Sequence, residues 1–425
     1  MKRYSEYKDS GVKWIGEIPG HWKIVRLKFV TENLDYLREP ISAELRERKN
    51  PQYDYYGASG IIDKIDHYNV DDKVLLIGED GANLLMRNLP LVYRAEGKFW
   101  VNNHAHILKT RLNDYSFFAH LLESQDYTLF VTGTAQPKLS QFNLGNVPLP
   151  ISPINEQKIM GKYLDSKVAK IDEYISIAEK KIAALEELKQ TIIAEAVTRG
   201  IHKDVPMKDS GVKWIGMIPE HWKVLCLKYL SKIKGRIGYR GYTAADLVSE
   251  GEGAFVIGGK HINQCILNTE SPDYISWDKY YESPEIMVSK GDIVMAQRGS
   301  LGKVALIDKE INEATINPSL VLIKDICCDA SFLYFYLRSN STLTLIELLN
   351  TATAVPMISQ KQIEKMPIPL PPLPEQQEIV TYIEAKAAKI DQLCQAERSQ
   401  IEKLKEYKQR LISDVVTGKV KVTND

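Results

Sequence analysis

The sequence lacks the features that define several large classes of protein. Its 425 residues contain no run of eighteen apolar residues, so no membrane-spanning helix is expected. Residues 1–6 lack the apolar core of a signal peptide. The five cysteines form no Cys-x-x-Cys pair, which argues against a zinc site and a disulfide framework. Because 55 acidic residues balance 55 basic ones, the net charge does not predict a protein that coats nucleic acid. The length and composition predict a multidomain cytoplasmic protein.

Motifs that carry catalysis are also missing. None of the Gly-Lys pairs is followed by the Ser or Thr of a phosphate-binding loop, and neither a Gly-x-Ser-x-Gly turn nor a His-Glu-x-x-His helix occurs. His104 and His106 are spaced to share one strand face, but the sequence offers no obvious third metal ligand beside them. We therefore predict a protein that is not an enzyme and holds no metal.

The sequence does contain an internal repeat. Residues 8–28 and 208–228, here called the leading segments, are identical at 16 of 21 positions. Further matches follow at an offset of 219 residues, pairing 134–141 with 353–360, 148–150 with 367–369, and 170–172 with 389–391. The chain therefore reads as two copies of one unit, each with a leading segment, a head, a Pro-rich hinge and a long polar segment.

Each long polar segment is predicted to be a helix that packs against the other. Apolar residues recur there at alternating steps of four and three, with Glu and Lys between them, which is typical of a coiled coil. The predicted seam, on helices expected to dock partner proteins, comprises Leu164, Val168, Ile171, Ile175, Ile182, Leu185, Ile383, Ile390, Ile401, Leu404 and Leu411. Lys189, Glu397 and Lys408 interrupt this seam, so we expect specific pairing. Gly200 and Gly418 are predicted to end the helices, which at ~1.5 Å per residue form rods of roughly 60 Å.

The two heads, residues 29–133 and 229–352, show no evident similarity to each other although their flanks match. Short apolar runs between Gly and Asn turns predict β-rich heads, each ending in helical sequence at 115–123 and 330–349. The predicted division is 1–150 for the first leading segment and head, 151–204 for the central helix, 205–370 for the second leading segment and head, and 371–425 for the C-terminal helix. One framework presenting two different surfaces indicates a bivalent reader.

Several head loops combine glycine with side chains that can pair with phosphates or base edges. The candidate DNA-binding residues of the first unit are Tyr55, Tyr56, Ser59, Arg87, Asn102, Asn103, His104, Thr134, Gln136 and Lys138. Those of the second unit are Lys234, Arg236, Tyr239, Arg240, Lys260, His261, Gln297, Arg298, Ser300, Lys303 and Thr353. The alternative for any one of these residues is an ordinary turn with a solvated charge.

Charge limits what the heads can bind alone. The first head carries 11 basic and 16 acidic residues, and the second carries 12 and 15. Because neutralising phosphates dominates non-specific DNA affinity, we expect a partner to supply much of the basic surface.

The chain resembles the specificity subunits of type I restriction–modification systems. The resemblance rests on DSGVKWIGEIPGHWKIVRLK with its repeat, GDIVMAQRGSLGKVALI at 291–307, PLPPLPEQQEIVTYIEAKAAKID at 369–391, and LKEYKQRLISDVVTGKV at 404–420. Residues 137–140 and 356–359 are similar to the family's loop before each hinge, and 298–303 to its Gly-rich turn. Asn155 departs from the pattern, since the second copy has Pro374 at that place.

The resemblance implies an α+β fold in which two globular mixed α/β target-recognition domains are joined by two long antiparallel coiled-coil helices with a pseudo-two-fold repeat. Each domain would read one half of an asymmetric, bipartite site in double-stranded DNA, while the helices set the spacer and dock partners. Those partners would be two methyltransferase subunits and two endonuclease/translocase subunits. S-adenosylmethionine, ATP and Mg would belong to the partners, with no cofactor in this chain.

Two other interpretations stay open from the residues alone. The chain could be a coiled-coil adaptor whose two heads bind proteins, which would bind without regard to DNA sequence. It could also be a nuclease or methyltransferase without a recognisable motif, which would be active as a purified chain.

Overall fold

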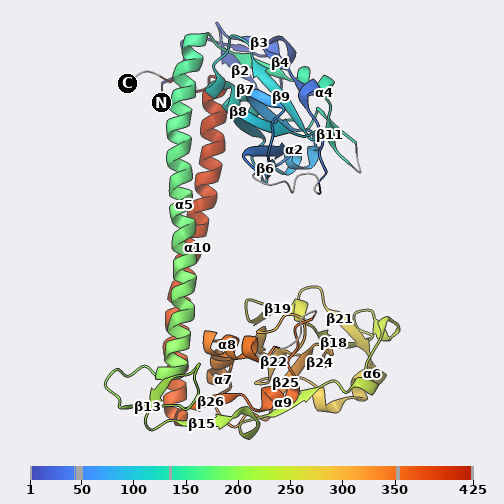
Figure 1. Cartoon of the computed structure of the whole chain (residues 1–425), viewed down its shortest axis with the longest axis vertical. Helices are drawn as coiled ribbons and strands as arrows, with labels where there is room; N and C mark the ends of the chain where they lie inside the picture. Colours follow the sequence, from blue (N-terminus) through green and yellow to red (C-terminus); the bar gives the residue numbers. More distant parts are fainter. Residues whose placement is uncertain (1, 43, 45–50, 134–135, 351–354, 423–425) are drawn as a thin grey trace. The chain divides into compact units, whose positions relative to one another are not determined.

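The computed structural model describes residues 2–42, 44, 51–133, 136–350 and 355–422. The chain forms two compact units, unit 1 (Met1–Glu179 with Arg398–Asp425) and unit 2 (Lys180–Glu397). Each unit therefore contains one head and part of both long helices, α5 (Ile154–Arg199) and α10 (Leu373–Val416) (Figure 1). Among the described residues, no helix is long and apolar enough to cross a membrane.

The sequence repeat is also a structural repeat. Each leading segment folds into a small hairpin and then a strand that pairs with the hinge strand of the same unit. In unit 1 these strands are β1 (Tyr7–Asp9) with β2 (Glu17–Pro19), and β3 (Lys23–Arg26) with β12 (Pro148–Ile151). In unit 2 they are β13 (Met207–Asp209) with β14 (Met217–Pro219), and β15 (Lys223–Cys226) with β26 (Pro367–Leu370).

The head of unit 1 is built on one six-stranded sheet in the order β4-β9-β7-β8-β5-β6. The strands are β4 (Thr31–Asn33), β5 (Tyr53–Gly57), β6 (Gly60–Ile65), β7 (Val70–Gly78), β8 (Val92–Val101) and β9 (Ala105–Thr110). Smaller elements are α2 (Gly81–Met86), α3 (Tyr115–Glu123), α4 (Gln141–Gly145), β10 (Val131–Thr132), β11 (Lys138–Leu139), and the short 3-10 helices η1 (Leu27–Phe29) and η2 (Asp35–Leu37). Only β5 and β8 run parallel among the neighbouring strands described in this sheet.

The head of unit 2 contains two four-stranded sheets, β16-β25-β22-β23 and β17-β21-β18-β24. Their strands are β16 (Lys232–Gly235), β17 (Leu247–Val248), β18 (Gly253–Ile257), β21 (Asp273–Ser276), β22 (Ile293–Ala296), β23 (Val304–Leu306), β24 (Ala314–Ile316) and β25 (Leu320–Lys324). The remaining elements are α6 (Trp277–Tyr281), α7 (Ala330–Leu337), α8 (Asn340–Leu349), α9 (Gln360–Glu364), β19 (Ile262–Asn263), β20 (Ile266–Leu267), and the 3-10 helices η3 (Leu227–Tyr229), η4 (Gly238–Arg240), η5 (Ala244–Asp246), η6 (Gly259–His261) and η7 (Pro284–Ile286).

The two heads share a core that the sequence comparison missed. The antiparallel order β4-β9-β7-β8 in unit 1 corresponds to β16-β25-β22-β23 in unit 2. A helix follows in both heads, and Asp114 and Asp329 cap α3 and α7 by accepting from the backbone N–H three residues on, at 2.9 Å in both cases. The two heads therefore have a common core although their sequences show no evident similarity.

The predicted helix at 115–123 is confirmed as α3, whereas the predicted helix at 330–349 is two helices, α7 and α8. The break falls at Ser339, whose hydroxyl donates to the Tyr336 carbonyl at 2.7 Å. A side chain that bonds to nearby backbone in this way offers an alternative to continuing the helix.

Each head packs its helix between its sheet and the long helices. In unit 1, Phe117 of α3 lies in one buried cluster with Leu75 of β7, Leu164 of α5 and Leu411 of α10. In unit 2, Phe332 of α7 lies in the corresponding cluster with Ile293, Ile383 and Val197. The long helices are thus part of the core of each unit, and burial of these side chains contributes about 1.5–3 kcal/mol for each large apolar group.

The long helices end where the sequence predicts. Gly200 and Gly418 follow α5 and α10 with φ of +76° and +75°, a left-handed conformation that glycine adopts without strain. Both helices fall inside the predicted segments 151–204 and 371–425, although each helix is divided between the two compact units.

Candidate functional site

A loop after the central strand of each head meets the segment before the hinge. In unit 1 the loop after β7 bonds to residues 136–139, with Gly81 N–H donating to the Pro137 carbonyl at 2.7 Å and Leu139 N–H to the Glu79 carbonyl at 2.9 Å. Asp80 and Lys138 form an isolated bridge between these two segments. The structure therefore brings the candidate Lys138 beside a loop that lies more than fifty positions earlier in the chain.

Unit 2 repeats this arrangement with different side chains. Gly299 N–H donates to the Pro356 carbonyl at 2.8 Å, and Ile358 N–H donates to the Gln297 carbonyl at 2.9 Å. Arg298 and Met357 form the isolated bridge that corresponds to Asp80 and Lys138. We call residues 78–81 with 136–139, and 297–300 with 355–358, the paired loops of unit 1 and unit 2. One backbone frame thus presents two different sets of side chains, as a reader of two different half-sites requires.

Ion pairs hold the paired loops of unit 1. Glu79 bonds Arg38 at 2.8 Å and lies 3.5 Å from Lys138, while His104 lies 3.1 Å from Asp80. Partial burial alone would raise the pKa of Glu79, but the Arg38 hydrogen bond and nearby positive charge lower it. Glu79 therefore stays ionised and orients Lys138, whose side chain is exposed to solvent.

The paired loops of unit 2 leave more positive charge uncompensated. The exposed Arg298 donates to the sulfur of Met357 at 3.4 Å, and its guanidinium has no carboxylate partner among the described residues. Lys303 donates to the Gly259 carbonyl at 2.9 Å, Gln297 donates to the Pro318 carbonyl at 3.0 Å, and Ser300 is exposed. A free guanidinium beside an amide is well suited to base edges in the major groove.

Three candidate residues of unit 1 are buried and serve the core instead. Tyr55 is 1% exposed and its hydroxyl accepts a hydrogen bond from Ile41 N–H at 3.2 Å. Tyr56 and Asn102 are also buried, and Asn102 accepts from the His104 N–H at 2.8 Å, which shapes the loop. Their prediction as surface contacts is wrong for this structure, because each side chain points into packed protein.

The same correction applies to Arg236 and His261 in unit 2. Arg236 is buried and donates to Thr315 Oγ1 at 3.1 Å and to the Ile316 carbonyl at 3.3 Å; burial lowers the pKa of this guanidinium. His261 is buried, and its Nδ1 accepts from Gly258 N–H at 2.9 Å. These two residues organise the second head and do not reach solvent.

The other candidates are distributed along the surfaces of the two heads. Ser59, Asn103 and Gln136 are exposed, Lys234 is half-buried, Arg87 bonds the Glu123 carbonyl, Arg240 pairs with Glu285 at 3.4 Å and Lys260 with Asp273 at 2.8 Å. Thr134, Thr353 and the side chain of Tyr239 lie outside the described residues. Contact of the exposed candidates with DNA stays a prediction.

Asp35, which was not among the predicted site residues, anchors the sheet beneath the paired loops of unit 1. Its carboxylate lies 2.6 Å from His106 Nδ1 and accepts from Ile107 N–H at 2.8 Å, while His106 Nε2 lies 2.7 Å from the Leu139 carbonyl. His106 is therefore a buried structural residue, unlike the exposed His104. Among the described residues, no group of three or more His, Cys, Asp or Glu side chains is placed to hold a metal.

A repeated anchor that was not predicted joins each leading segment to its helix. Glu156, near the start of α5, accepts from the indole N–H of Trp22 at 3.1 Å and lies 2.7 Å from His21. Glu375, near the start of α10, makes the same two contacts with Trp222 and His221 at 3.1 and 2.7 Å. The sequence signal for this anchor is the recurrence of two dipeptides, His-Trp in the leading segments and Glu-Gln at the start of the helices.

The predicted seam residues pack the two helices against each other within each unit. Leu164, Ile171 and Leu411 are buried in the core of unit 1, and Ile383 in that of unit 2. Val168, Ile175, Ile182, Leu185 and Leu404 are half-buried, while Ile390 and Ile401 are buried. The seam is confirmed, since its buried side chains join the two helices, and docking of partner proteins on these helices stays a prediction.

The seam polar residues pair as expected, and their pairing fixes the helix direction. In unit 2, Lys189 bonds Asp391 and Lys181 bonds Glu397, so partner numbers fall along α10 as they rise along α5. In unit 1, Lys408 bonds Asp172 at 2.7 Å. The helix segments in each unit therefore run antiparallel.

The fold and its paired loops define a class of protein with two related recognition heads on antiparallel coiled-coil helices. The type I restriction modification DNA specificity domain matches residues 19–187 and 219–403. The chain belongs to this family and carries two copies of the domain. It is a non-catalytic subunit that confers DNA sequence specificity on a type I restriction–modification complex.

Comparison with individual proteins agrees with this assignment. The chain is 24% identical over 435 residues to the type I restriction enzyme MjaVIII specificity subunit of Methanocaldococcus jannaschii, covering 98% of both chains. It is 26% identical over 365 residues to a putative type I restriction enzyme specificity subunit of Haemophilus influenzae, covering 85% of this chain and 86% of the relative.

Solved structures share the fold. A chain from a study of complex assembly and conformational transition of the type I R-M system aligns with a TM-score of 0.70 at 19% identity, over 95% of this chain and 99% of the other. The HsdS subunit from Thermoanaerobacter tengcongensis aligns with a TM-score of 0.50 at 18% identity, over 95% and 98%.

Proposed function

We propose that each unit reads one half of an asymmetric, bipartite site in double-stranded DNA through its paired loops. The supporting observation is the repeated backbone frame with unlike side chains, Lys138 and Asp80 in unit 1 against Met357 and Arg298 in unit 2. Phosphate contacts position a protein on DNA and side-chain contacts to base edges specify sequence, so different side chains on one frame predict different half-sites. Protein-binding heads would leave the match to a DNA specificity domain unexplained.

Substitution in one pair of loops at a time tests this proposal. Arg298→Ala removes the exposed guanidinium of unit 2, and Lys138→Ala removes the exposed ammonium of unit 1. Sequencing of DNA methylated by the assembled complex should show each variant relaxing or losing a single half-site, and a different one in each case. Equal loss at both half-sites would indicate a folding defect and would contradict separate reading.

We propose that the outer face of the helices docks two methyltransferase subunits. Tyr174 and Tyr407 in unit 1 are 64% and 48% exposed, and Leu393 and Leu188 in unit 2 are 44% and 48% exposed. Each stands one residue before a seam position, and the offset of 219 relates Tyr174 to Leu393 and Leu188 to Tyr407. Exposed apolar residues at repeated positions fit two copies of one apolar partner.

Native mass spectrometry of the assembled complex tests this docking. Replacing Tyr174 and Tyr407 with Lys should leave one methyltransferase subunit per chain, and so should replacing Leu188 and Leu393 with Lys. Gln400→Lys, which adds the same charge at an exposed polar position of α10, should retain both subunits. Retention of both subunits by either double variant would contradict the proposal.

The remaining partners follow from the same proposal. Two endonuclease/translocase subunits would join for cleavage, and S-adenosylmethionine, ATP and Mg would bind to the partner subunits. The complex would act in the cytoplasm, where cellular DNA and invading DNA meet. The two long helices would set the unread spacer between half-sites.

A further inference from the structure

Unit 1 has a pocket of about 420 Å³ beside the edge strand of its sheet. It lies between η1, β4, the residues after β9, and α4. Its lining includes Lys28, Arg111, Asn33, Gln141 and Phe142, and no carboxylate stands among the described lining residues. The head itself, residues 29–133, carries 16 acidic residues against 11 basic ones.

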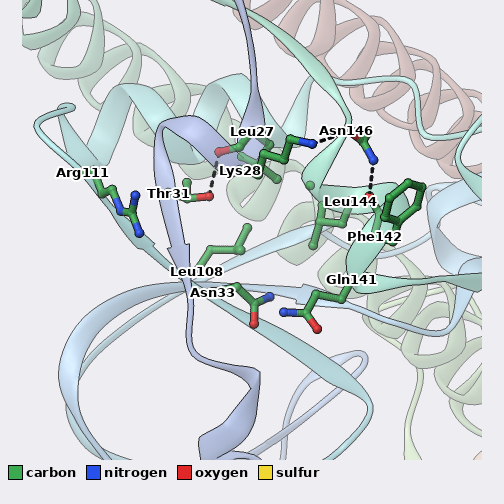
Figure 2. Close-up of a pocket in the computed structure, with 11 residues that line it drawn as sticks. Leu27, Lys28, Thr31, Asn33, Leu108, Arg111, Gln141, Phe142, Leu144 and Asn146 are labelled. Atoms are coloured by element: carbon green, nitrogen blue, oxygen red, sulfur yellow. Dashed lines mark hydrogen bonds between the residues drawn. The ribbon is translucent and has the colours of Figure 1, made fainter.

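The polar groups of this pocket converge on its interior. Figure 2 shows the side-chain amides of Asn33 and Gln141 pointing toward one another, with Arg111 reaching in from the other side. Asn33 Oδ1 accepts from the Asp35 N–H at 2.9 Å, which leaves its amide N–H groups to donate outward. The pocket therefore presents hydrogen-bond donors of both charged and neutral kinds.

The two cations that line this pocket, Lys28 and Arg111, have no carboxylate partner among the described residues. Lys28 and Arg26 both donate to one neutral oxygen, Asn146 Oδ1, at 3.1 and 3.3 Å (Figure 2 shows the Lys28 bond). Arg111 has no side-chain hydrogen bond or ion pair among the described residues.

Two cations elsewhere in the head have a carboxylate partner. Lys73 lies 2.9 Å from Glu96, and Arg94 lies 2.7 Å from Asp165. Uncompensated positive charge around a hollow with amide donors is the chemistry that holds a phosphate oxygen.

The pocket is lined by segments that adjoin the paired loops of unit 1 in the sequence. Gln141 follows Lys138 by three residues, and Leu108 in the lining belongs to β9, the strand that starts just after His104. A duplex that contacts Lys138 and His104 carries phosphates at regular spacing along both strands, so a neighbouring phosphate is available to this pocket.

We propose that this pocket holds a backbone phosphate of the DNA, with Arg111 and Lys28 supplying charge and the amides of Asn33 and Gln141 supplying neutral donors. The proposal rests on the proposed DNA-reading function of unit 1 and adds a positioning contact to it. Such a contact fixes the register of the head on the duplex and carries no sequence information of its own.

Binding of duplex DNA by the complete complex, measured over a series of salt concentrations, tests the proposal. Arg111→Gln should weaken binding several-fold and reduce the slope of log K against log salt by about 0.9, equally for duplexes with and without the recognition site. Lys28→Gln should act in the same direction. Lys73→Gln removes the same charge from a compensated cation on the same head and should leave the slope unchanged.

An Arg111→Gln slope equal to that of Lys73→Gln would overturn the phosphate contact. A loss confined to the duplex with the recognition site would overturn it too, because it would assign Arg111 to base reading. If the unmodified complex itself fails to prefer its recognition site, the proposed function fails, and the salt slopes still decide whether Arg111 contacts phosphate. If inorganic phosphate binds the unmodified chain, and Arg111→Gln leaves the slope of log K against log salt for DNA unchanged, the pocket would instead be a site for free phosphate.

Discussion

Lys189 donates to both carboxylate oxygens of Asp391, at 2.8 and 2.7 Å, from a position where the seam would otherwise be apolar. The same contact recurs 219 residues away as Lys408 with Asp172, at 2.7 and 2.8 Å. Each unit thus contains one lysine in its seam that is matched to one aspartate of the other helix. Polar groups in a coiled-coil seam favour one register over its alternatives at some expense of stability.

A double-mutant cycle should detect this pairing. Lys189→Ala and Asp391→Ala should each destabilise unit 2 slightly, and the double variant should show a coupling free energy of about 0.5–1 kcal/mol that weakens with salt. The measurement is chemical unfolding of the four variants, with the Lys408 and Asp172 cycle as the matched control in unit 1. Strict additivity in both cycles would contradict a specific pair.

The repeated indole–carboxylate anchor should stabilise each unit separately. Glu156→Ala would leave the fully buried Trp22 indole N–H without an acceptor in unit 1, at a cost of about 1–3 kcal/mol. Hydrogen exchange should show loss of protection confined to unit 1. Glu375→Ala should produce the same loss in unit 2 through Trp222.

Glu173→Ala, at an exposed position of α5, serves as the control for the anchor variants and should leave protection unchanged. If Glu156→Ala loosened both units equally, the anchor would not act unit by unit. If it loosened neither, the indole bond would contribute nothing to stability.

The Asp35–His106 pair should make unit 1 sensitive to acid. Burial alone would raise the pKa of Asp35, but hydrogen bonds from His106 and Ile107 lower it. A carboxyl whose folded pKa lies below its unfolded value of about 3.9 contributes stability above that value, and loses it as pH falls through the folded pKa. Asp35→Asn should therefore destabilise unit 1 by about 2–4 kcal/mol at neutral pH.

The variant should also show a shallower loss of stability in acid, because it has no carboxyl to protonate at this site. Urea unfolding at a series of pH values below 6 measures both effects. An acid dependence identical to that of the unmodified chain would contradict the assignment of Asp35 as an acid-sensitive anchor.

Shortening both long helices should change the spacer without changing either half-site. Deleting residues 178–184 and 397–403 removes one heptad from each helix and takes out Lys181 and Glu397 together. Since a heptad rises about 10 Å and base pairs stack every 3.4 Å, the spacer should shorten by at most about three base pairs. An unchanged spacer in the methylated motif would show that the helices do not set it.

The features that depend on local periodicity were predictable from the sequence. Apolar residues recur seven positions apart along each helix, as at Leu164 and Ile171 or at Leu404 and Leu411, and glycines 200 and 418 mark the helix ends, so the helices follow directly. The sequence also predicts that the lysines in the seam are paired, because a charge in an apolar stripe requires a partner. The partner itself, an exposed aspartate on the other helix, could be found only from the register of pairing.

The heads were less predictable because their core depends on strand order. Asp114 and Asp329 cap equivalent helices, yet too few identities surround them to reveal the relation in one sequence. Burial explains the errors among the candidate site residues: Tyr55 and Arg236 lie in Gly-rich, polar sequence typical of a loop, while long-range packing places both inside the protein. Arg111 was not predicted as a site residue, because the absence of a carboxylate beside its side chain depends on the tertiary structure and is not visible in the neighbouring sequence.

This chain determines which DNA sequence its complex modifies. The direct test is a single-molecule methylome of cells that carry the chain with its methyltransferase, compared with cells in which the chain is deleted. A gapped, asymmetric adenine-methylation motif that disappears on deletion is the predicted result, and it would also provide both half-sites. A motif that persists unchanged without the chain would contradict the account.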